Sequence, residues 1–156
     1  MFGVNFVAFE KRQGYQGMKY QTELLSVANC PPQACSPQNI RAYRFVYDPL
    51  DSTSFLPQGI KDPARAHKET RVPVKCSLYA LSMFTTEQKA IEKYRDLKKF
   101  VKNIDKTIGS HLAEGQVTTT DGTMSTPNRK GHFDVFEYSG VDFTNSFSIS
   151  TDLSGV

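Results

Sequence analysis

The chain has 156 residues, of which 38% are hydrophobic, and its eleven Phe and seven Tyr residues are enough to fill one core. We therefore expect one compact domain spanning residues 1–156. No apolar run approaches the roughly 20 residues that a membrane-spanning helix needs, and the opening MFGVNFVAFEKR lacks the basic region and cleavage site of a signal peptide. These observations argue against a membrane protein and favour a cytoplasmic location.

The formal net charge of +3 is unevenly distributed along the chain. Residues 1–106 contain 17 Lys or Arg against 10 Asp or Glu, a net of +7, whereas residues 107–156 contain 2 against 6, a net of −4. A basic segment of this kind is typical of surfaces that bind phosphate or nucleic acid. The opposite charges also predict that the two parts attract each other in the folded chain.

The three cysteines, Cys30, Cys35 and Cys76, are too few and odd in number for the disulfide framework of a secreted protein. We therefore expect reduced thiols. The two cysteines of CPPQAC are separated by four residues, which is not the CxxC spacing, and no second pair of Cys or His stands at metal-binding spacing. The sequence thus predicts no metal site.

The first half of the chain favours short elements. Bulky apolar residues in VNFVAFEKR, residues 4–12, predict a strand, and YQTELLSVA, residues 20–28, predicts a brief helix that ends before a proline-rich stretch. A compact strand is predicted at AYRFVY, residues 42–47. Residues 48–73 contain four prolines and little periodicity, which predicts a long loop of the kind that often forms a lid or a binding segment.

VKCSLYALSMF, residues 74–84, is the best candidate for a central strand, because both of its alternating faces contain apolar residues. In the following TTEQKAIEKYRDLKKFVKNI, Thr85 and Gln88 stand at capping-box spacing. A helix is predicted here, with its lysines, including Lys93, mostly on a solvated face. The apolar stripe that would lie on the sheet consists of Ala90, Ile91, Tyr94, Leu97, Val101 and Ile104.

The last third of the chain favours strands. TIGSHLAEGQV, residues 107–117, and GHFDVFEYSG, residues 131–140, predict a hairpin with a long polar loop, and FSIS, residues 147–150, predicts an edge strand. Together the elements predict an α+β fold, with a mixed or antiparallel sheet of about five or six strands packed against one main amphipathic helix.

Three polar residues lie on predicted strands beside apolar neighbours. Alternation places Glu114 on the same face as Ile108 and Leu112, so its carboxylate is paired, solvated at the strand end, or part of a site. Arg44 lies inside YRFVY, where its guanidinium needs a carboxylate or phosphate partner because it cannot lose its proton. Ser82, near the end of a buried strand, is able to face a cleft.

Two histidines lie on the two late strands. If these strands pair, His111 and His132 face each other, and with Arg129 or Lys130 they suit metal-independent phosphodiester cleavage, one imidazole acting as base and the other as acid. The alternative is that each histidine is a non-catalytic residue. The sequence contains no GxSxG, Walker A, HExxH, GxGxxG or EF-hand motif, so the common enzyme classes that use them lack support.

The order of the polar residues resembles that of the ADP-ribosyltransferase-like fold. YRFV supplies an Arg on an early strand, LSMFTT a strand that ends in hydroxyl groups, and HLAEGQV a Glu near the end of a late strand. The resemblance covers residues 43–117, with Leu112 where many family members have a first acid. It implies that Arg44 engages the phosphates of NAD, that Ser82 supports the pocket, and that Glu114 holds the nicotinamide ribose.

The same resemblance implies that Tyr79 or Tyr43 stacks on the nicotinamide and that NAD is the substrate. Cleavage at the anomeric carbon of a ribose builds positive charge that a carboxylate stabilises. Glu114 is therefore the expected essential carboxylate, with Ser82 beside it.

Three functions remain open from the sequence. The first is NAD-dependent ADP-ribosyl transfer or NAD cleavage by a toxin-like enzyme. The second is a non-enzymatic interaction domain whose basic first two thirds bind an acidic protein or nucleic acid. The third is a small metal-independent ribonuclease that uses His111 and His132.

Overall fold

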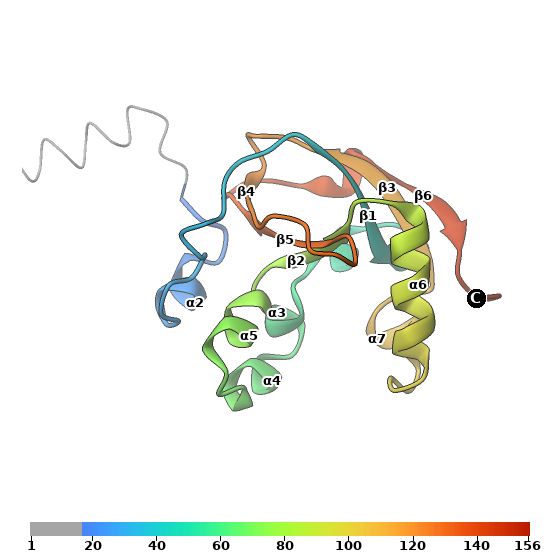
Figure 1. Cartoon of the computed structure of the whole chain (residues 1–156), viewed down its shortest axis with the longest axis horizontal. Helices are drawn as coiled ribbons and strands as arrows, with labels where there is room; N and C mark the ends of the chain where they lie inside the picture. Colours follow the sequence, from blue (N-terminus) through green and yellow to red (C-terminus); the bar gives the residue numbers. More distant parts are fainter. Residues whose placement is uncertain (1–16) are drawn as a thin grey trace, which may run out of the picture.

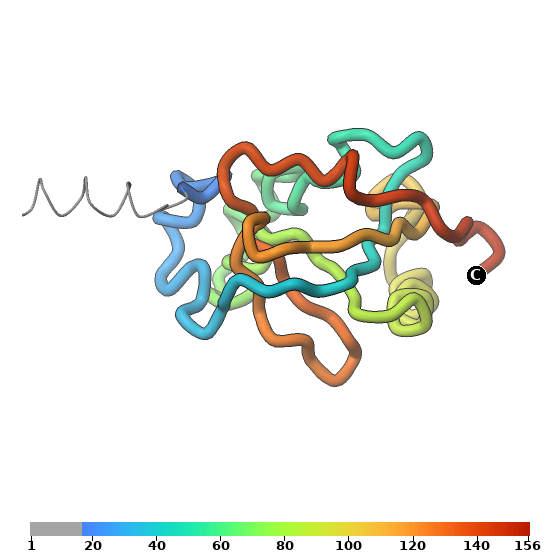
Figure 2. Tube along the Cα trace, turned by 90° about the horizontal axis from the view of Figure 1, so that it is seen from above, coloured from blue at the N-terminus to red at the C-terminus, as the bar shows by residue number. Residues whose placement is uncertain are grey.

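In the computed structural model, residues 17–156 are described, so the strand predicted at residues 4–12 lies outside the described residues. The centre of the fold is an antiparallel sheet of six strands in the order β4-β5-β2-β1-β3-β6. Figure 2 views the sheet from above, with β6, β3 and β1 side by side. The strands are β1 (Ile40–Val46), β2 (Leu81–Phe84), β3 (His111–Val117), β4 (Gly122–Met124), β5 (His132–Glu137) and β6 (Phe147–Asp152).

The α-helices lie on one side of this sheet (Figure 1). The main helix is α6 (Glu87–Lys98), and the predicted α+β fold with one main helix on a sheet is confirmed. No helix among the described residues is long and apolar enough to cross a bilayer. The shorter helical elements are α2 (Gln21–Leu25), η1 (Ser52–Phe55), α3 (Gln58–Lys61), α4 (Pro63–Lys68), α5 (Val72–Ser77), α7 (Ile104–Thr107) and η2 (Phe143–Asn145).

The apolar stripe of α6 packs on the sheet as the periodicity predicts. Ala90 and Tyr94 are buried, and the ring centroid of Tyr94 lies 5.3 Å from that of Phe45. The Tyr94 hydroxyl donates to the backbone carbonyl oxygen of Gly109 at 2.8 Å. Burial of the apolar face, together with this satisfied buried hydroxyl, holds α6 against the sheet.

The N-terminus of α6 differs from the predicted capping box by one residue. Thr86 is the cap, and its hydroxyl oxygen accepts the backbone N–H of Lys89 at 3.1 Å. Thr85 lies one residue before this cap, and its backbone N–H donates to the carbonyl oxygen of Gly131 at 2.9 Å, so it is not available to the Gln88 side chain. The Gln88 side chain does not reach back to the cap and turns along the helix instead.

The opposite face of the sheet contains a second, aromatic core. Phe55 of η1, Phe143 of η2 and Phe147 of β6 pack together, with Phe143 and Phe147 centroids 5.6 Å apart. Because side chains alternate along a strand, Val46 and Ala113 point to this core while their neighbours point to α6. The sheet is therefore buried on both faces.

The strand predicted at residues 74–84 is wrong in its first half, because residues up to Ser77 form α5 and only Leu81–Phe84 form β2. Pro73 in the first helical turn favours a helix start. The predicted loop at residues 48–73 is also not structureless, since it contains η1, α3 and α4. Apolar runs of this length do not distinguish a buried strand from a short buried helix.

The predicted hairpin of the two late strands is wrong in its pairing. β3 pairs with β1 and β6, whereas β5 pairs with β2 and β4. The segment between them forms β4, which turns back onto β5. The predicted edge strand at residues 147–150 is confirmed as part of β6. Alternation indicates which face a residue occupies but not which strand lies beside it.

Cys30 and Cys76 form a disulfide across 46 positions of the sequence, and Cys35 is a half-buried free thiol. The prediction of three reduced thiols is therefore wrong for two of them. Distant cysteines meet only once the tertiary fold brings their segments together. Disulfides are typical of oxidising compartments, so this bond does not support the predicted cytoplasmic location.

Two ion pairs join the basic and acidic parts of the chain. Lys19 Nζ lies 2.8 Å from Glu137 Oε2, and Arg41 Nη2 lies 3.1 Å from Glu114 Oε1. The predicted attraction between residues 1–106 and the remainder is thus seen at two places in the sheet.

Candidate functional site

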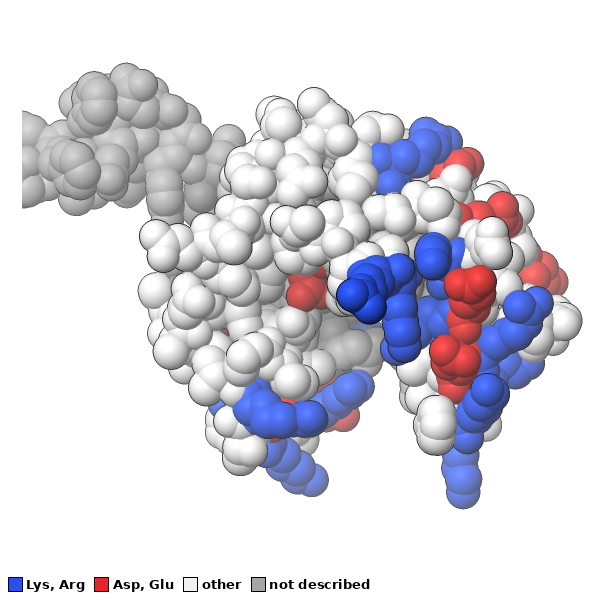
Figure 3. Space-filling model, viewed as in Figure 1, with Lys and Arg blue, Asp and Glu red and all other residues white. Residues whose placement is uncertain are grey.

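A cavity of about 270 Å³ opens between two groups of helices on the sheet. Figure 3 shows this hollow below the sheet, with Lys and Arg side chains on both sides of it. One wall is α6, the other is formed by α3, α4 and α5, and the floor is the face of β2 and β5. Its polar lining consists of Arg44, Gln58, Arg65, Ser77, Ser82, Lys93, His132 and Asp134.

The floor is set by the register of two strands. β2 and β5 pair with Ser82 opposite Asp134 and with Phe84 opposite His132. Because alternate residues of a strand share one face, all four side chains point to the cavity. The Phe84 ring stands edge-on to the His132 imidazole, with centroids 5.5 Å apart.

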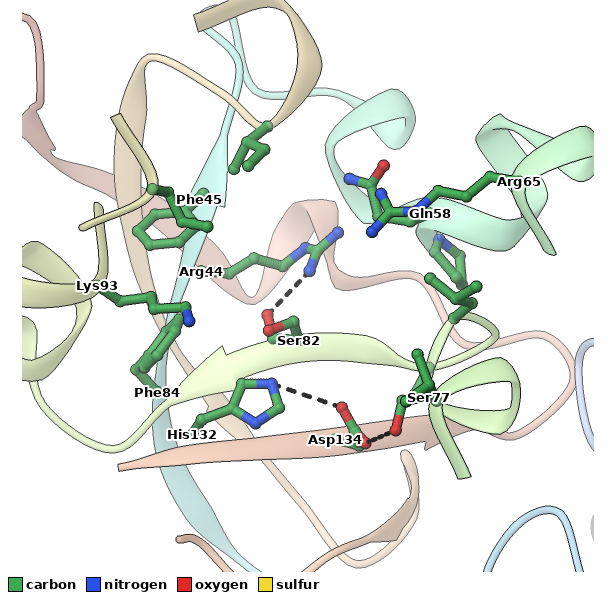
Figure 4. Close-up of a pocket in the computed structure, with 16 residues that line it drawn as sticks. Arg44, Phe45, Gln58, Arg65, Ser77, Ser82, Phe84, Lys93, His132 and Asp134 are labelled. Atoms are coloured by element: carbon green, nitrogen blue, oxygen red, sulfur yellow. Dashed lines mark hydrogen bonds and ion pairs between the residues drawn. The ribbon is translucent and has the colours of Figure 1, made fainter. Parts of the chain in front are cut away.

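His132, Asp134 and Ser77 form a polar row along this floor (Figure 4). Asp134 Oδ2 accepts the Ser77 hydroxyl at 2.8 Å, and Asp134 Oδ1 lies 3.6 Å from His132 Nε2. The second distance is too long for a direct hydrogen bond. His132 Nε2 therefore keeps its capacity to bond a molecule in the cavity.

Burial dominates the electrostatics of this row. Burial lowers the pKa of His132 below its ordinary value, Asp134 opposes this change, and Lys93 adds to it. Burial also raises the pKa of Asp134, whereas the Ser77 hydroxyl and His132 lower it. A neutral imidazole beside a carboxylate is the state in which histidine acts as a general base.

Three cationic side chains among the described residues line the cavity, and each comes from a different element. Arg44 belongs to β1, Arg65 to α4 and Lys93 to α6. Asp134 is the one carboxylate among the described lining residues. With His132 neutral, three cations against one anion leave a net of +2, which favours an anionic ligand.

Arg44 lies where β1 and β2 diverge, since the two strands pair only at Tyr43 and Phe84. Arg44 Nη1 donates to the carbonyl oxygen of Ser82 at 2.9 Å, and Nε donates to that of Ser54 at 2.8 Å. Its hydrogen-bond partners are thus backbone carbonyls and not the carboxylate or phosphate expected from the sequence. Burial lowers its pKa to about 10, so the guanidinium remains charged at neutral pH.

The residues assigned to NAD by resemblance are only partly brought together. Arg44 and Ser82 line the cavity, whereas Tyr79 and Tyr43 do not. Tyr79 is buried beside α3, where its ring packs closely against Gly59. The Tyr43 hydroxyl donates to a carboxylate oxygen of Glu114 at 2.7 Å. The two tyrosines therefore have structural partners of their own.

Glu114 lies outside the cavity, on β3. It pairs with Arg41 at 3.1 Å and accepts the Tyr43 hydroxyl, and its side chain is 31% exposed. These hydrogen bonds, first from Arg41 and then from Tyr43, lower the pKa of Glu114. β1 separates Glu114 from Phe84 on the cavity floor, which places them two strand spacings, or about 10 Å, apart.

His111 and His132 are not brought together either. β1 and β2 lie between their strands, so at least three strand spacings, or more than about 14 Å, separate them. His111 Nε2 instead lies 3.8 Å from Asp48 and 3.9 Å from Asp152. The arrangement of two facing imidazoles therefore does not form, although His132 gains other polar neighbours.

Sequence reasoning missed three polar residues that line the cavity together with His132. Asp134 follows two residues later in HFDVFE, and strand alternation alone would have placed both side chains on one face. Ser77 does not stand out because the pattern of residues 74–84 predicts a strand where α5 forms. Lys93 was assigned to the solvated face of the helix, yet it lines the cavity.

Comparison with known proteins finds no matching family model, no matching curated protein and no matching solved structure. Among residues 17–156, no cluster of three or more His, Cys, Asp or Glu side chains is placed to hold a metal ion.

Proposed function

We propose that the cavity binds a small phosphate-bearing nucleotide and that His132, with Asp134, performs acid–base chemistry on it. The observation that supports this most directly is the convergence of Arg44, Arg65 and Lys93 on a cavity with a half-buried His–Asp pair in its floor. Clustered Arg and Lys side chains bind phosphate through charge-assisted hydrogen bonds.

The shape and the apolar lining support a nucleotide of limited size. The volume of about 270 Å³ is near the lower end for ligand pockets, which span about 300–1,000 Å³. Phe45, Phe84, Leu97 and Ile108 supply an apolar wall against which a base or sugar can pack. The enclosed space suits one nucleotide unit, so a dinucleotide would extend out of the cavity.

The chemistry follows from the protonation states. Neutral His132 would accept a proton from an attacking hydroxyl or water, and Asp134 would stabilise the imidazolium that forms. Lys93 and Arg65 would stabilise negative charge on the phosphate. In this scheme Ser77 holds the Asp134 carboxylate in place.

NAD is the specific substrate that we propose to test first, following the resemblance to ADP-ribosyltransferases. One nucleotide half of NAD would occupy the cavity beside Arg44 and Ser82. Glu114 would act only if the other half extends along the sheet past Tyr43. Otherwise Asp134 is the carboxylate nearest to the cleaved bond.

Calorimetric titration of the full chain with AMP and with adenosine tests the binding step. We expect AMP to bind at least tenfold more tightly, because only AMP offers a phosphate to the cations. Lys93→Gln should remove most of this preference. Lys102→Gln, at an exposed residue that does not line the cavity, is the matched control. Equal affinity for the two ligands would contradict the proposal.

Incubation with NAD, followed by chromatography of released nicotinamide, tests the reaction. Loss of release in His132→Gln but not in Glu114→Gln would assign the chemistry to the cavity. The opposite pattern would support the role that the resemblance gives to Glu114. Absence of release with tight AMP binding would leave the nucleotide site but remove NAD cleavage.

The interaction-domain hypothesis has one observation in its favour, the basic side chains on both sides of the hollow (Figure 3). The affinity for an acidic protein or a nucleic acid that binds there would fall steeply with salt concentration. This affinity would also be insensitive to His132→Gln, because a binding surface needs no proton transfer. Titration with a single-stranded oligonucleotide at two salt concentrations separates this hypothesis from a nucleotide site.

A further inference from the structure

The disulfide joins α5 to a segment that is itself fixed to the sheet. Cys76 lies in α5, and Cys30 lies in the segment that precedes β1. Ser36, six residues after Cys30, exchanges two backbone hydrogen bonds with Met124 of β4, at 3.0 and 2.9 Å. The covalent bond therefore connects one cavity wall to the edge of the sheet.

Residues next to Cys76 in α5 and at its C-terminal end line the cavity. Ser77 directly follows Cys76, and its hydroxyl donates to Asp134 at 2.8 Å. Val74 and Leu78 line the same wall. The disulfide thus fixes the residue next to Ser77, and so affects the Ser77–Asp134 hydrogen bond and, through Asp134, His132.

Few other contacts hold the middle of α5. The helix has six residues, too few to be stable alone, and Val72 and Val74 in its first turn are 45% and 37% exposed. Its C-terminal end is tied by the backbone N–H of Gly59, which donates to the Leu78 carbonyl oxygen at 2.7 Å. Cys76 is the buried residue of the helix itself.

We infer that the Cys30–Cys76 disulfide is a redox-sensitive clamp on the cavity, and that Ser77 is the positioning residue through which the clamp acts on Asp134. An external dithiol would supply two electrons and two protons. The Cys30–Cys76 bond then breaks and the two cysteines become thiols, while the reductant is oxidised to its own disulfide. α5 would then loosen, Ser77 would release Asp134, and water would enter the cavity. Only the consequence for ligand binding rests on the proposed function.

Cys35 does not supply an internal route to this exchange. Its thiol is half-buried, and burial, followed by the charge of Asp134, raises its pKa. A thiol that stays protonated is a poor nucleophile toward a disulfide. The reductant must therefore come from outside the chain.

The test is an NMR titration of the His132 imidazole in the full chain, before and after reduction with dithiothreitol. His132 is surrounded by the Asp134 carboxylate and by the cations Lys93, Arg44 and Arg65. We expect its pKa to rise toward the ordinary histidine value on reduction, because water replaces the buried surroundings and Asp134 is released. The chain has two other histidines, so the His132→Gln variant assigns the signal.

Two variants make the outcome specific. Ser77→Ala in the oxidised chain should move the His132 pKa in the same direction, since Asp134 loses its hydroxyl donor while the disulfide stays intact. Cys35→Ser should leave it unchanged. The inference is overturned if the His132 titration is the same after mass spectrometry shows the disulfide to be broken. It also fails if reduction abolishes the amide signals of α6, because the disulfide would then be a general staple.

Because no ligand is present in these titrations, they can succeed or fail independently of nucleotide binding. A second measurement joins the two proposals: the affinity for AMP should differ between oxidised and reduced chains. An unchanged affinity, together with a shifted His132 pKa, would keep the clamp and remove the nucleotide from this cavity.

Discussion

One wall of the cavity is a single helix, whereas the opposite wall is assembled from three short ones. α6 has twelve residues and buries a continuous apolar stripe on the sheet. The helices α3, α4 and α5 have four, six and six residues. The disulfide ties α5 to the edge of the sheet, and the hydrogen bond from Gly59 to Leu78 ties α3 to the end of α5. Periodic burial builds the first wall and individual tertiary contacts build the second, so the two should respond differently to substitution.

The largest expected effect is on the α6 wall. Tyr94→Ala should lower the free energy of unfolding by about 3–5 kcal/mol, because it removes a buried ring that packs on Phe45. Urea denaturation measures this change. Tyr94→Phe is the control that keeps the ring and loses only the hydrogen bond to Gly109, at a cost of about 1 kcal/mol. Equal effects of both variants would contradict the packing account of this wall.

The second wall should depend on its covalent tie. Cys30→Ser should lower the free energy of unfolding by about 2–4 kcal/mol, since the disulfide closes a long loop in the unfolded chain. Cys35→Ser, which leaves the disulfide intact, should cost about 1 kcal/mol or less. Denaturation under non-reducing conditions compares them, and similar losses would show that the disulfide has no special role.

A smaller effect is expected where α3 meets α5. A Cβ at Gly59 would lie 2.9 Å from the carbonyl oxygen of Leu78 and 3.0 Å from the ring of Tyr79. Gly59→Ala should therefore cost about 1–3 kcal/mol through overpacking. Gly155→Ala, where nothing lies within 4 Å, is the matched control. If both variants are neutral in thermal denaturation, this wall is looser than its contacts indicate.

The smallest expected effect is a pH dependence that originates between the walls. The folded chain binds the His132 proton more weakly than the unfolded chain, because burial lowers the pKa. As the pH falls through the ordinary histidine value of about 6.5, the unfolded state gains its proton first and the folded state loses stability.

The slope of the free energy of unfolding from this one group cannot exceed about 1.4 kcal/mol per pH unit. Comparison of the wild-type chain with His132→Gln between pH 5.5 and 7 isolates it. The raised pKa of Asp134 acts in the opposite direction, since it adds stability in acid that is lost as the pH rises through its folded value. An unchanged slope in His132→Gln would mean that His132 is not buried as described.

The same difference between the walls explains what could be predicted from the sequence. α6 was predicted because its apolar stripe repeats over many residues, and β1 because it is a compact run of bulky side chains. The sequence predicts a strand in place of α5, because a six-residue helix held by a disulfide leaves no periodic signal. Local patterns report elements that are stabilised by regular burial and miss those held by single contacts.

The site was predictable to a similar degree. Arg44, Ser82 and His132 stood out as polar residues on apolar strands, and all three line the cavity. Glu114 stood out for the same reason, but its partners Arg41 and Tyr43 come from another strand and could not be paired from sequence. Such pairings depend on the order of the strands in the sheet, and local sequence patterns do not indicate that order.

An NMR titration of the isotopically labelled full chain with AMP tests the central claim most directly. The account predicts that the largest amide and side-chain shifts occur at Ser82, Lys93 and His132, on the floor and the α6 wall. It also predicts that Glu114 and the β6 edge stay nearly unchanged. Shifts centred on Glu114, or no saturable shifts at all, would contradict the claim that this cavity is the functional site.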